Sequence, residues 1–245
     1  MKGMILAAGL GTRLRPRTET TPKALLPVGG KPLLEILLSK MAAAGIHRVA
    51  VNAHHHADQV ERFLREAKRP GAETRLFQEE EILGTGGGVR NAASFLEGGE
   101  PVLVHNVDVL SNLFFRMLLD DHERSGAAVT LAVQRRQTER PLASDSEGRF
   151  CGRWGESPVN LPRGEVRPVA FSGVQIMRGD VPPRLPGKGA FSLIDSYLAM
   201  AHSGEEIRLF PMDEWYWADV GTQERLEKVE EDFRELRIPL ESLMS

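Results

Sequence analysis

The chain of 245 residues contains a single cysteine, Cys151, so it cannot form an internal disulfide. A lone thiol fits a reducing compartment. No stretch approaches the ~20 consecutive apolar residues that a membrane-spanning helix requires. The first apolar run is short and continues into glycines and arginines, unlike a secretory signal. We therefore predict a cytoplasmic protein that does not insert into a membrane.

The chain also lacks an excess of charge of either sign. It has 31 Lys and Arg residues against 34 Asp and Glu residues, which gives a net charge of −3. This balance excludes a general attraction to nucleic acid or to an anionic membrane surface, so any affinity for phosphate groups must be local. There is no internal repeat and no low-complexity segment. The length suits one α/β domain with an appended lobe.

A glycine-rich turn follows the first apolar run. Residues 4–8 predict a buried strand, and Gly9 and Gly11 come directly after it. Glycine allows turns in which successive N–H groups point at one spot. Arg13 and Lys23 add two cations, so the segment predicts an anion site, and we interpret the anion as the phosphates of a nucleotide. The segment fits neither common phosphate-loop pattern, and glycines that serve packing beside a solvated basic face are the alternative.

Apolar spacing over the rest of the chain predicts alternating strands and helices. This alternation favours a mostly parallel sheet that is covered on both faces and binds ligands at the carboxyl ends of its strands. Residues 134–167 lack the pattern and predict hairpins and loops over the sheet. The helix at 58–67 is expected to be closed by residues 70–71. The predicted helices are 32–44, 58–67, 85–96, 112–123, 191–202 and 222–236, and the further strands are 49–51, 74–77, 101–107, 127–133, 169–177, 207–210 and 215–220.

Two aspartates are candidate metal ligands. Asp108 follows the predicted central strand at 101–107, and Asp219 lies in the apolar segment W-A-D-V-G-T. An unpaired charge in an apolar strand is costly, and Gly221 permits close backbone approach. Mg²⁺ accepts one or two carboxylates together with phosphate oxygens, so this pair beside a basic turn predicts a magnesium site. Turn or helix-cap roles are the alternative for each aspartate taken alone.

Residues 78–88 (Q-E-E-E-I-L-G-T-G-G-G) follow a predicted strand and open a helix. Gly84 and Gly86 would let a flat base lie against the backbone. Gln78 or one of the three glutamates could then bind the edge of the base: a carboxylate suits guanine, and an amide suits uracil. The remaining glutamates are expected to be solvated.

Two other clusters favour structural roles. The three histidines at 54–56 diverge on a loop and lack a completing ligand pattern, so we predict a solvent-exposed turn into the next helix. The aromatic residues at 215–217 are expected to pack within a strand beside Asp219.

The segments 9–16, 21–23 (T-P-K) and 25–33 together resemble the signature of the sugar-1-phosphate nucleotidyltransferases. The resemblance covers residues 1–136 and returns at 171–177, 191–198 and 217–222. It implies an α/β, Rossmann-like, mostly parallel mixed sheet with helices on both faces and a small acceptor-binding lobe. It also implies an enzyme that joins a nucleoside triphosphate to a sugar 1-phosphate and releases pyrophosphate. We expect no C-terminal β-helix of hexapeptide repeats.

The resemblance implies a role for each matching residue within one domain, with residues 1–136 as the nucleotide-binding half and 137–245 as the sugar-phosphate-binding half. Arg13 and Lys23 would be the catalytic cations. Asp108 and Asp219 match the family's metal aspartates, which implies Mg²⁺ as cofactor, although Val107 stands where relatives usually carry glycine. The residues expected to bind the nucleotide are Leu6, Ala8, Gly9, Leu10, Gly11, Thr12, Arg13, Lys23, Gln78, Gly84 and Gly86.

On the acceptor side, the resemblance implies that Asn106 reaches hydroxyl groups of the sugar or the ribose. Gly173, in an F-x-G strand, would leave room for the sugar, and a β-bulge or a packing glycine is the alternative. Many relatives carry Glu-Lys-Pro before this strand, and the lysine holds the sugar's phosphate. This chain has R-G-E-V-R-P at 163–168, so Arg163 or Arg167 is expected to substitute.

Three functions stay open. By length the chain is similar to the compact muramate-1-phosphate uridylyltransferases and the mannose- or heptose-1-phosphate guanylyltransferases, so UTP or GTP is favoured. A phosphocholine cytidylyltransferase would need aromatic rings around a quaternary ammonium, and only Trp154 suits that role. A silent regulatory subunit would be expected to have lost one of Arg13, Lys23, Asp108 and Asp219, all of which are present. We expect a monomer or a small homo-oligomer, and the sugar is not defined.

Overall fold

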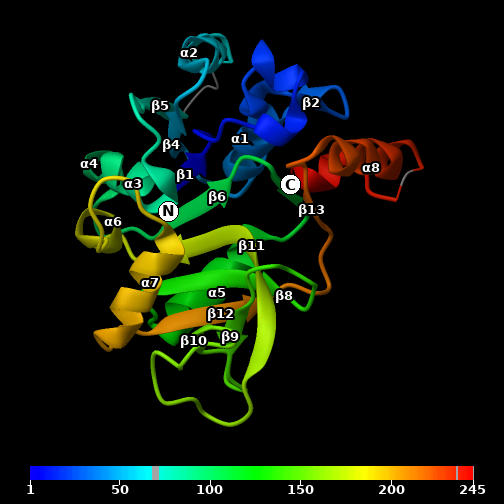
Figure 1. Cartoon of the computed structure of the whole chain (residues 1–245). Helices are drawn as coiled ribbons and strands as arrows, with labels where there is room; N and C mark the ends of the chain where they lie inside the picture. Colours follow the sequence, from blue (N-terminus) through cyan, green and yellow to red (C-terminus); the bar gives the residue numbers. More distant parts are fainter. Residues whose placement is uncertain (68–71, 236, 245) are drawn as a thin grey trace.

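The computed structural model describes residues 1–67, 72–235 and 237–244. In these ranges a nine-stranded mixed sheet forms the centre of the molecule (Figure 1). Its parallel part has the order β6-β1-β4-β5, and β11 pairs antiparallel with both β6 and β8, while β12 runs parallel to β8. The predicted α/β class is confirmed. These strands are β1 (Lys2–Leu6), β4 (Arg48–Ala53), β5 (Glu73–Gln78), β6 (Val102–Asn106), β8 (Val129–Gln134), β11 (Arg167–Met177) and β12 (Ile207–Pro211).

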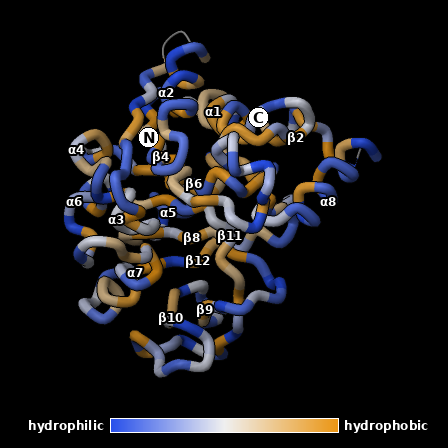
Figure 2. The backbone as a smooth tube through the Cα atoms, turned by 45° about the horizontal axis from the view of Figure 1, so that its top comes forward, coloured by the Kyte–Doolittle hydropathy of each residue, from blue (hydrophilic) through white to orange (hydrophobic). Residues whose placement is uncertain are grey.

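Successive residues of the central strands face two separate cores. In β1, Ile5 belongs to the core on one face and Met4 to the core on the other, because side chains alternate along a strand. This explains why the sequences of the central strands are apolar throughout. Figure 2 shows hydrophobic residues concentrated in the interior of the molecule. The first core includes residues of α1 (Leu33–Ala43), α2 (Ala57–Glu66), α5 (Phe115–Ser125) and α8 (Gln223–Arg234), and the second includes residues of α3 (Gly84–Asn91), α4 (Ala93–Leu96), α6 (Val181–Arg184) and α7 (Leu193–His202).

Residues 134–167 form the predicted hairpin region. β9 (Leu142–Ser144) and β10 (Phe150–Arg153) pair antiparallel and extend the sheet along the first half of β11, as the small lobe at the bottom of Figure 1. The buried carboxylate of Asp145 closes the lobe, since it accepts hydrogen bonds from the backbone N–H groups of Glu147, Arg149 and Arg163 at 2.9–3.0 Å.

A short ribbon lies beside the main sheet. β7 (Val109–Ser111) pairs antiparallel with β13 (Trp217–Asp219), so segments more than a hundred residues apart become neighbours. The first half of the chain also contains a second small ribbon and three short 3₁₀ segments. These elements are β2 (Pro27–Val28), β3 (Lys31–Pro32), η1 (Thr12–Leu14), η2 (Arg17–Glu19) and η3 (Lys23–Leu25), and η4 (Leu240–Leu243) follows α8.

Several predicted boundaries differ from those observed. The helix predicted at 85–96 is two helices separated at Ala92. The helix predicted at 112–123 begins only at Phe115, because Asn112 accepts a hydrogen bond from the Tyr216 N–H and Ser111 accepts one from the Leu113 N–H. The stops expected at residues 70–71 and 236 lie outside the described residues. No helix in the described ranges combines the length and apolar character needed to cross a membrane.

Candidate active site

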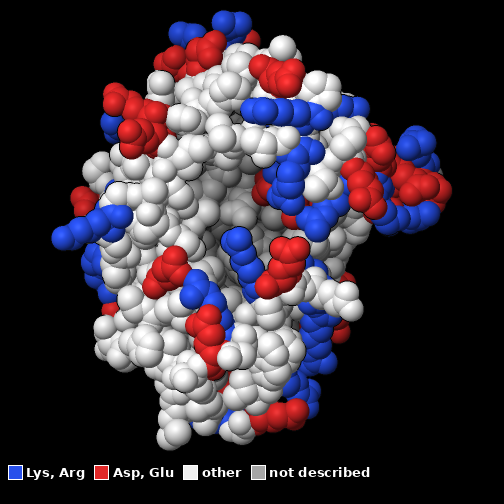
Figure 3. Space-filling model, in the orientation of Figure 1, with Lys and Arg blue, Asp and Glu red and all other residues white. Residues whose placement is uncertain are grey.

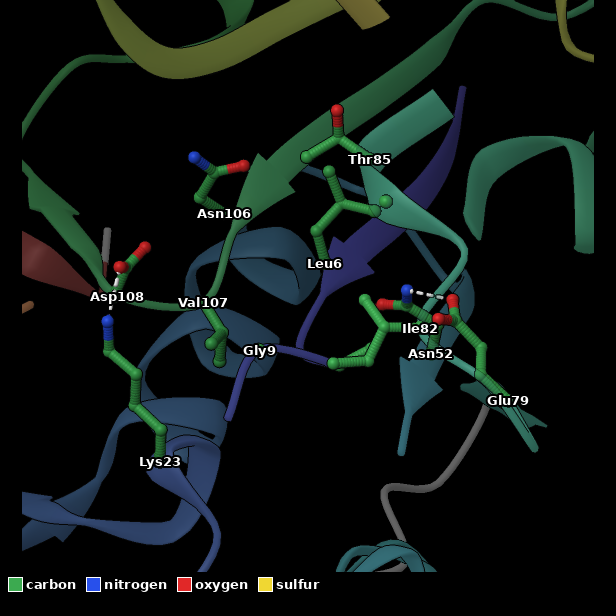
Figure 4. A pocket seen from close by; sticks show the side chains of 12 residues that line it. Leu6, Gly9, Lys23, Asn52, Glu79, Ile82, Thr85, Asn106, Val107 and Asp108 are labelled. Carbon is green, nitrogen blue, oxygen red and sulfur yellow. Dashed lines mark hydrogen bonds and ion pairs between the residues drawn. The ribbon is translucent and has the colours of Figure 1, made fainter. Parts of the chain in front are cut away.

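A cavity opens at the carboxyl ends of β1, β4 and β6, where parallel sheets bind ligands (Figure 4). We call it the strand-end cavity. All of its lining residues come from the first half of the chain. They are Leu6, Ala8, Gly9, Lys23, Asn52, Glu79, Ile82, Gly84, Thr85, Asn106, Val107 and Asp108.

The two glycines of the first turn have different structural roles. Gly11 has a left-handed backbone (φ +62°), and a Cβ there would lie 2.9 Å from the Thr18 methyl group. The Thr18 hydroxyl donates to the Gly11 carbonyl at 2.8 Å. A Cβ on Gly9 would meet nothing within 4 Å, so this glycine leaves the cavity wall open. Leu10 and Thr12 are exposed and, with Gly11, are not among the lining residues.

Lys23 and Asp108 form an ion pair at one side of the strand-end cavity. The Lys23 side chain, in η3, is only 9% exposed, and its Cβ lies close to the first turn, 3.4 Å from where a Cβ on Gly11 would be. A buried ammonium is stabilised by a nearby carboxylate, and this pairing positions both groups at the cavity. The pair therefore joins the end of β6 to the segment that follows the first turn.

Arg13 lies in a second recess, which also contains Asp219. This recess, the basic cleft, is lined by Arg13, residues 136–140, Asp219 and Arg225. A Cβ on Gly221 would lie 3.1 Å from an Arg13 nitrogen and 2.6 Å from Asp219 Oδ1, so the glycine makes room for both. The sequence predicted one anion site that contains both Arg13 and Lys23. The structure places these two residues in two different recesses.

Asp219 ends β13, and Asp108 immediately precedes β7, the strand that pairs with β13. Asp219 is opposite Val109 in the β7–β13 ladder, and the Val220 N–H donates to the Asp108 carbonyl at 2.9 Å. The two acids are therefore neighbours across the ribbon, although 110 residues separate them in the sequence. Figure 3 shows a hollow in this face of the molecule with basic and acidic side chains around it.

The donor set fits a magnesium ion in its chemistry. Two carboxylates are hard oxygen ligands, and Mg²⁺ typically takes one or two of them and completes its shell with water and phosphate oxygens. The Asp219 carboxylate accepts from the Gly221 N–H and pairs with Arg225, both at 2.6 Å, and Asp108 pairs with Lys23. The described residues contain no cluster of three His, Cys, Asp or Glu side chains that could hold a metal.

A buried amide and carboxylate organise the far side of the strand-end cavity. Asn52 Oδ1 accepts from the Ala7 N–H at 2.8 Å, and its Nδ2 donates to Glu79 Oε1 at 2.6 Å. Glu79 Oε2 accepts from the Leu83 N–H at 2.9 Å. Both oxygens of Glu79 thus have internal donors. The adjacent Gln78 is exposed and does not line the cavity.

The glycines of α3 bring its start close to Phe191. Gly84 lines the cavity with φ +70°, and a Cβ there would lie 2.6 Å from the Phe191 carbonyl oxygen. Gly86 is buried beneath the Phe191 ring, where a Cβ would lie 2.3 Å from a ring carbon, and its N–H donates to the Phe191 carbonyl at 2.9 Å. Gly84 is therefore at the cavity surface, whereas Gly86 is a packing position.

Gly173 lies against Asn106 at the end of β6. It has φ +81° at a register shift in β11, and a Cβ would lie 2.9 Å from Asn106 Nδ2 and from a Val109 methyl group. The β-bulge considered from the sequence is therefore present.

Neither arginine expected to replace the family's lysine lies in the cavity or the cleft. Arg163 is exposed and pairs with Glu147, and Arg167 pairs with Glu165; Glu147, Glu165 and Arg167 line a separate recess. Arg136, which the sequence did not single out, lines the basic cleft instead. Burial lowers the pKa of Arg136 from its ordinary value, and Asp219 opposes that shift.

The histidine cluster has a structural role. His54 Nδ1 is 2.9 Å from the Glu79 carbonyl oxygen, and His56 Nε2 is 3.0 Å from that of Glu19. Both rings are half-buried, so the expectation of a solvent-exposed turn holds for His55 only. The rings of His55 and His56 contact each other, with centroids 3.8 Å apart, and the described residues form no group of three metal-ligating side chains here.

Comparison with known proteins agrees with this architecture. Residues 2–143 match the model of the nucleotidyl transferase family, and the chain belongs to that family. The resemblance noted from the sequence is thereby confirmed.

Two relatives illustrate the similarity. The chain is 35% identical over 233 residues to N-acetylmuramate alpha-1-phosphate uridylyltransferase from Caulobacter vibrioides, covering 89% of this chain and 90% of the relative. It is 32% identical to mannose-1-phosphate guanylyltransferase from Mycobacterium tuberculosis over 90% of this chain, but it spans only 61% of that relative's length.

Solved structures share the fold. HddC from Yersinia pseudotuberculosis, solved with GMP-PN, superposes with a TM-score of 0.76 at 22% identity over 95% of this chain and 99% of the other. A putative glucose-1-phosphate thymidylyltransferase from Bacillus anthracis, solved with a sucrose, gives a TM-score of 0.80 at 21% identity over 97% of each chain.

Proposed function

We propose that this chain transfers a uridylyl group from UTP to a sugar 1-phosphate and releases pyrophosphate, with residues 1–136 binding the nucleotide and 137–245 the acceptor. The observation that carries the proposal is the juxtaposition of two acids and two cations. The Lys23–Asp108 pair borders the strand-end cavity, and Asp219 lies on the next strand with Arg13 beside it. Similarity to a uridylyltransferase over 90% of that enzyme's length supports it.

In the proposed reaction, an oxygen of the sugar phosphate forms a bond to the α-phosphorus of UTP. The bond from that phosphorus to the bridging oxygen of pyrophosphate breaks. The attacking oxygen is largely ionised at neutral pH, so no general base is needed. Catalysis then depends on positioning and on neutralising charge. Arg13 and the N–H groups of residues 9–12 would bind the β- and γ-phosphates, and Lys23 would neutralise the charge that develops between donor and acceptor.

Asp108 and Asp219 would hold Mg²⁺, which when bound supplies charge neutralisation of the phosphoryl oxygens. Lys23 and Arg225 pair with these two carboxylates. Lys23 of η3 therefore orients Asp108, and Arg225 of α8 orients Asp219.

The bonding of Glu79 supports UTP over GTP. Guanine recognition by a carboxylate requires that both oxygens face the N1–H and amino groups of the base with a lone pair each. Both oxygens of Glu79 already accept hydrogen bonds, from Asn52 and from the Leu83 N–H. The base would instead bind backbone groups near Gly84 and Thr85, which line the cavity.

A pyrophosphate-release assay tests the proposal. The purified chain is incubated with Mg²⁺, each of the four common NTPs, and either a panel of sugar 1-phosphates or phosphocholine, with Asp108→Asn as the matched control. We expect turnover with UTP and a sugar 1-phosphate, and its loss in the variant. Turnover with GTP alone would contradict the base assignment.

The two other functions give different results in the same assay. A phosphocholine cytidylyltransferase would turn over CTP with phosphocholine. Trp154, the aromatic residue suited to such a substrate, is exposed after β10 and lines neither the strand-end cavity nor the basic cleft. A regulatory subunit would bind nucleotide without releasing pyrophosphate.

A further inference from the structure

Arg136 occupies an unusual position beside the basic cleft. It follows β8 by two residues, and its guanidinium carbon lies 3.9 Å from the centroid of the Trp217 ring. Its Nη2 donates to the Phe171 carbonyl at 2.8 Å, and its buried Nε has no hydrogen-bond partner. The side chain is thus held against β11 and β13 with one donor unused.

Its charge is also uncompensated by a direct ion pair. Among the described residues, no carboxylate lies within ion-pair distance of Arg136, whereas Arg163, Arg167 and Arg225 each have one. Two acids, Glu139 and Asp219, line the basic cleft with Arg136, and Asp219 already pairs with Arg225. A half-buried guanidinium with this environment is suited to an anionic ligand.

The Trp217 ring restricts the position of the guanidinium, whose central carbon lies over the ring. The indole is itself anchored, because its Nε1 donates to the Ser172 carbonyl at 2.8 Å. A stacked arginine keeps its N–H edge available for in-plane hydrogen bonds, and this fork matches the oxygens of a phosphate. The Trp217 ring therefore orients Arg136 for a phosphate group beside Asp219.

We propose that Arg136 binds the phosphate of the acceptor sugar 1-phosphate, in the role that the sequence assigned to Arg163 or Arg167. This inference rests on the proposed function. The strand-end cavity is lined only by residues between Leu6 and Asp108, so the nucleotide approaches from that side. Arg136 is the last residue of the half assigned to the nucleotide, but its contacts Phe171 and Trp217 belong to the half assigned to the acceptor. Phe171 lies two residues before Gly173, which lies against Asn106.

Steady-state kinetics with two variants and one control test this assignment. Arg136→Gln removes the charge, and Arg136→Lys keeps the charge without the planar fork. Arg135→Gln is the matched control, because the adjacent Arg135 lines the recess on the other side, with Glu165 and Arg167. Thermal unfolding of all three verifies that they fold.

We expect Arg136→Gln to raise KM for the sugar 1-phosphate about tenfold or more while KM for UTP changes less than about twofold. Arg136→Lys should recover part of the loss, and Arg135→Gln should match the parent. An increase confined to KM for UTP, or for pyrophosphate in the reverse reaction, would overturn the assignment, as would unchanged kinetics.

Calorimetric titration with glucose 1-phosphate and with inorganic phosphate separates this inference from the proposed function. If the parent protein shows no turnover, the proposed function fails. Binding of either probe that weakens about tenfold in Arg136→Gln, and not in Arg135→Gln, would still support a phosphate site at Arg136. Equal affinity in both variants, or no binding to the parent, would refute it.

Discussion

Lys40 offers a quantitative test of how the β7–β13 ribbon is held. Its side chain, on α1, is 1% exposed, and its Nζ donates to the Ser111 carbonyl in β7. The ammonium also lies 4.9 Å from the centroid of the Phe115 ring. Burial lowers the pKa of Lys40 from 10.5 to about 7. The neighbouring His105 is also buried, which lowers its pKa to about 4 and leaves it neutral above that pH.

The lowered pKa makes the stability depend on pH in a defined direction. Below about pH 7 both the folded and the unfolded chain carry the Lys40 proton, so the cost of burying the charge is fully present. Between about pH 7 and 10.5 the unfolded chain binds the proton and the folded chain releases it, so the free energy of unfolding rises with pH. Each pH unit contributes up to about 1.4 kcal/mol, and the whole window about 5 kcal/mol.

Urea unfolding of the parent protein and of Lys40→Met, from pH 6.5 to 9.5, measures this effect. The methionine cannot titrate, so we expect the parent to gain stability relative to the variant by several kcal/mol across the range. Lys228→Met, at an exposed lysine of α8, is the control and should parallel the parent. If Lys40→Met also parallels the parent, Lys40 is not a buried titrating group, and the reasoning fails.

Three further predictions follow from the site and the core. Asp108→Asn and Asp219→Asn should each lower turnover by about a hundredfold or more in the pyrophosphate assay, and chelation of Mg²⁺ should do the same to the parent; a few-fold fall with folding intact would contradict the metal assignment. Gly84→Ala should destabilise the fold by at least about 1–2 kcal/mol in urea unfolding, because φ is +70° and the Phe191 carbonyl oxygen occupies the space; unchanged stability would show that the loop can move. Cys151 is 1% exposed and burial raises its pKa, so its reaction with a thiol reagent at pH 8 should be slow until the protein is unfolded.

Much of the fold was predictable from local patterns. Continuous apolar runs indicated strands buried on both faces, and β1, β4 and β6 have opposite core faces at successive residues. The loss of pattern after residue 134 correctly indicated hairpins. Helix boundaries were less predictable where residues near the helix start form hydrogen bonds with a distant segment. Asn112, for example, binds the Tyr216 N–H and delays the start of α5.

The candidate site was predictable where a residue follows a strand directly. Asp108 and Gly9 come shortly after the ends of two strands, and the carboxyl ends of parallel strands share one edge of the sheet. The sequence alone could therefore predict that both residues line one cavity. Gln78 and Glu79 show the limit of this reasoning. Gln78 ends β5 and Glu79 follows it, but Gln78 is exposed, whereas Glu79 is buried and bonded to Asn52 in the cavity.

The sequence by itself determined the fold class and the first turn, and it predicted two acids as candidate metal ligands. The tertiary structure decided which cations accompany them. Arg136, Arg163 and Arg167 lie in the same irregular stretch of sequence, and only contacts with β11 and β13 place Arg136 beside Asp219. Local sequence fixes backbone preference, whereas the direction of a long side chain depends on which distant carbonyl, ring or carboxylate it meets.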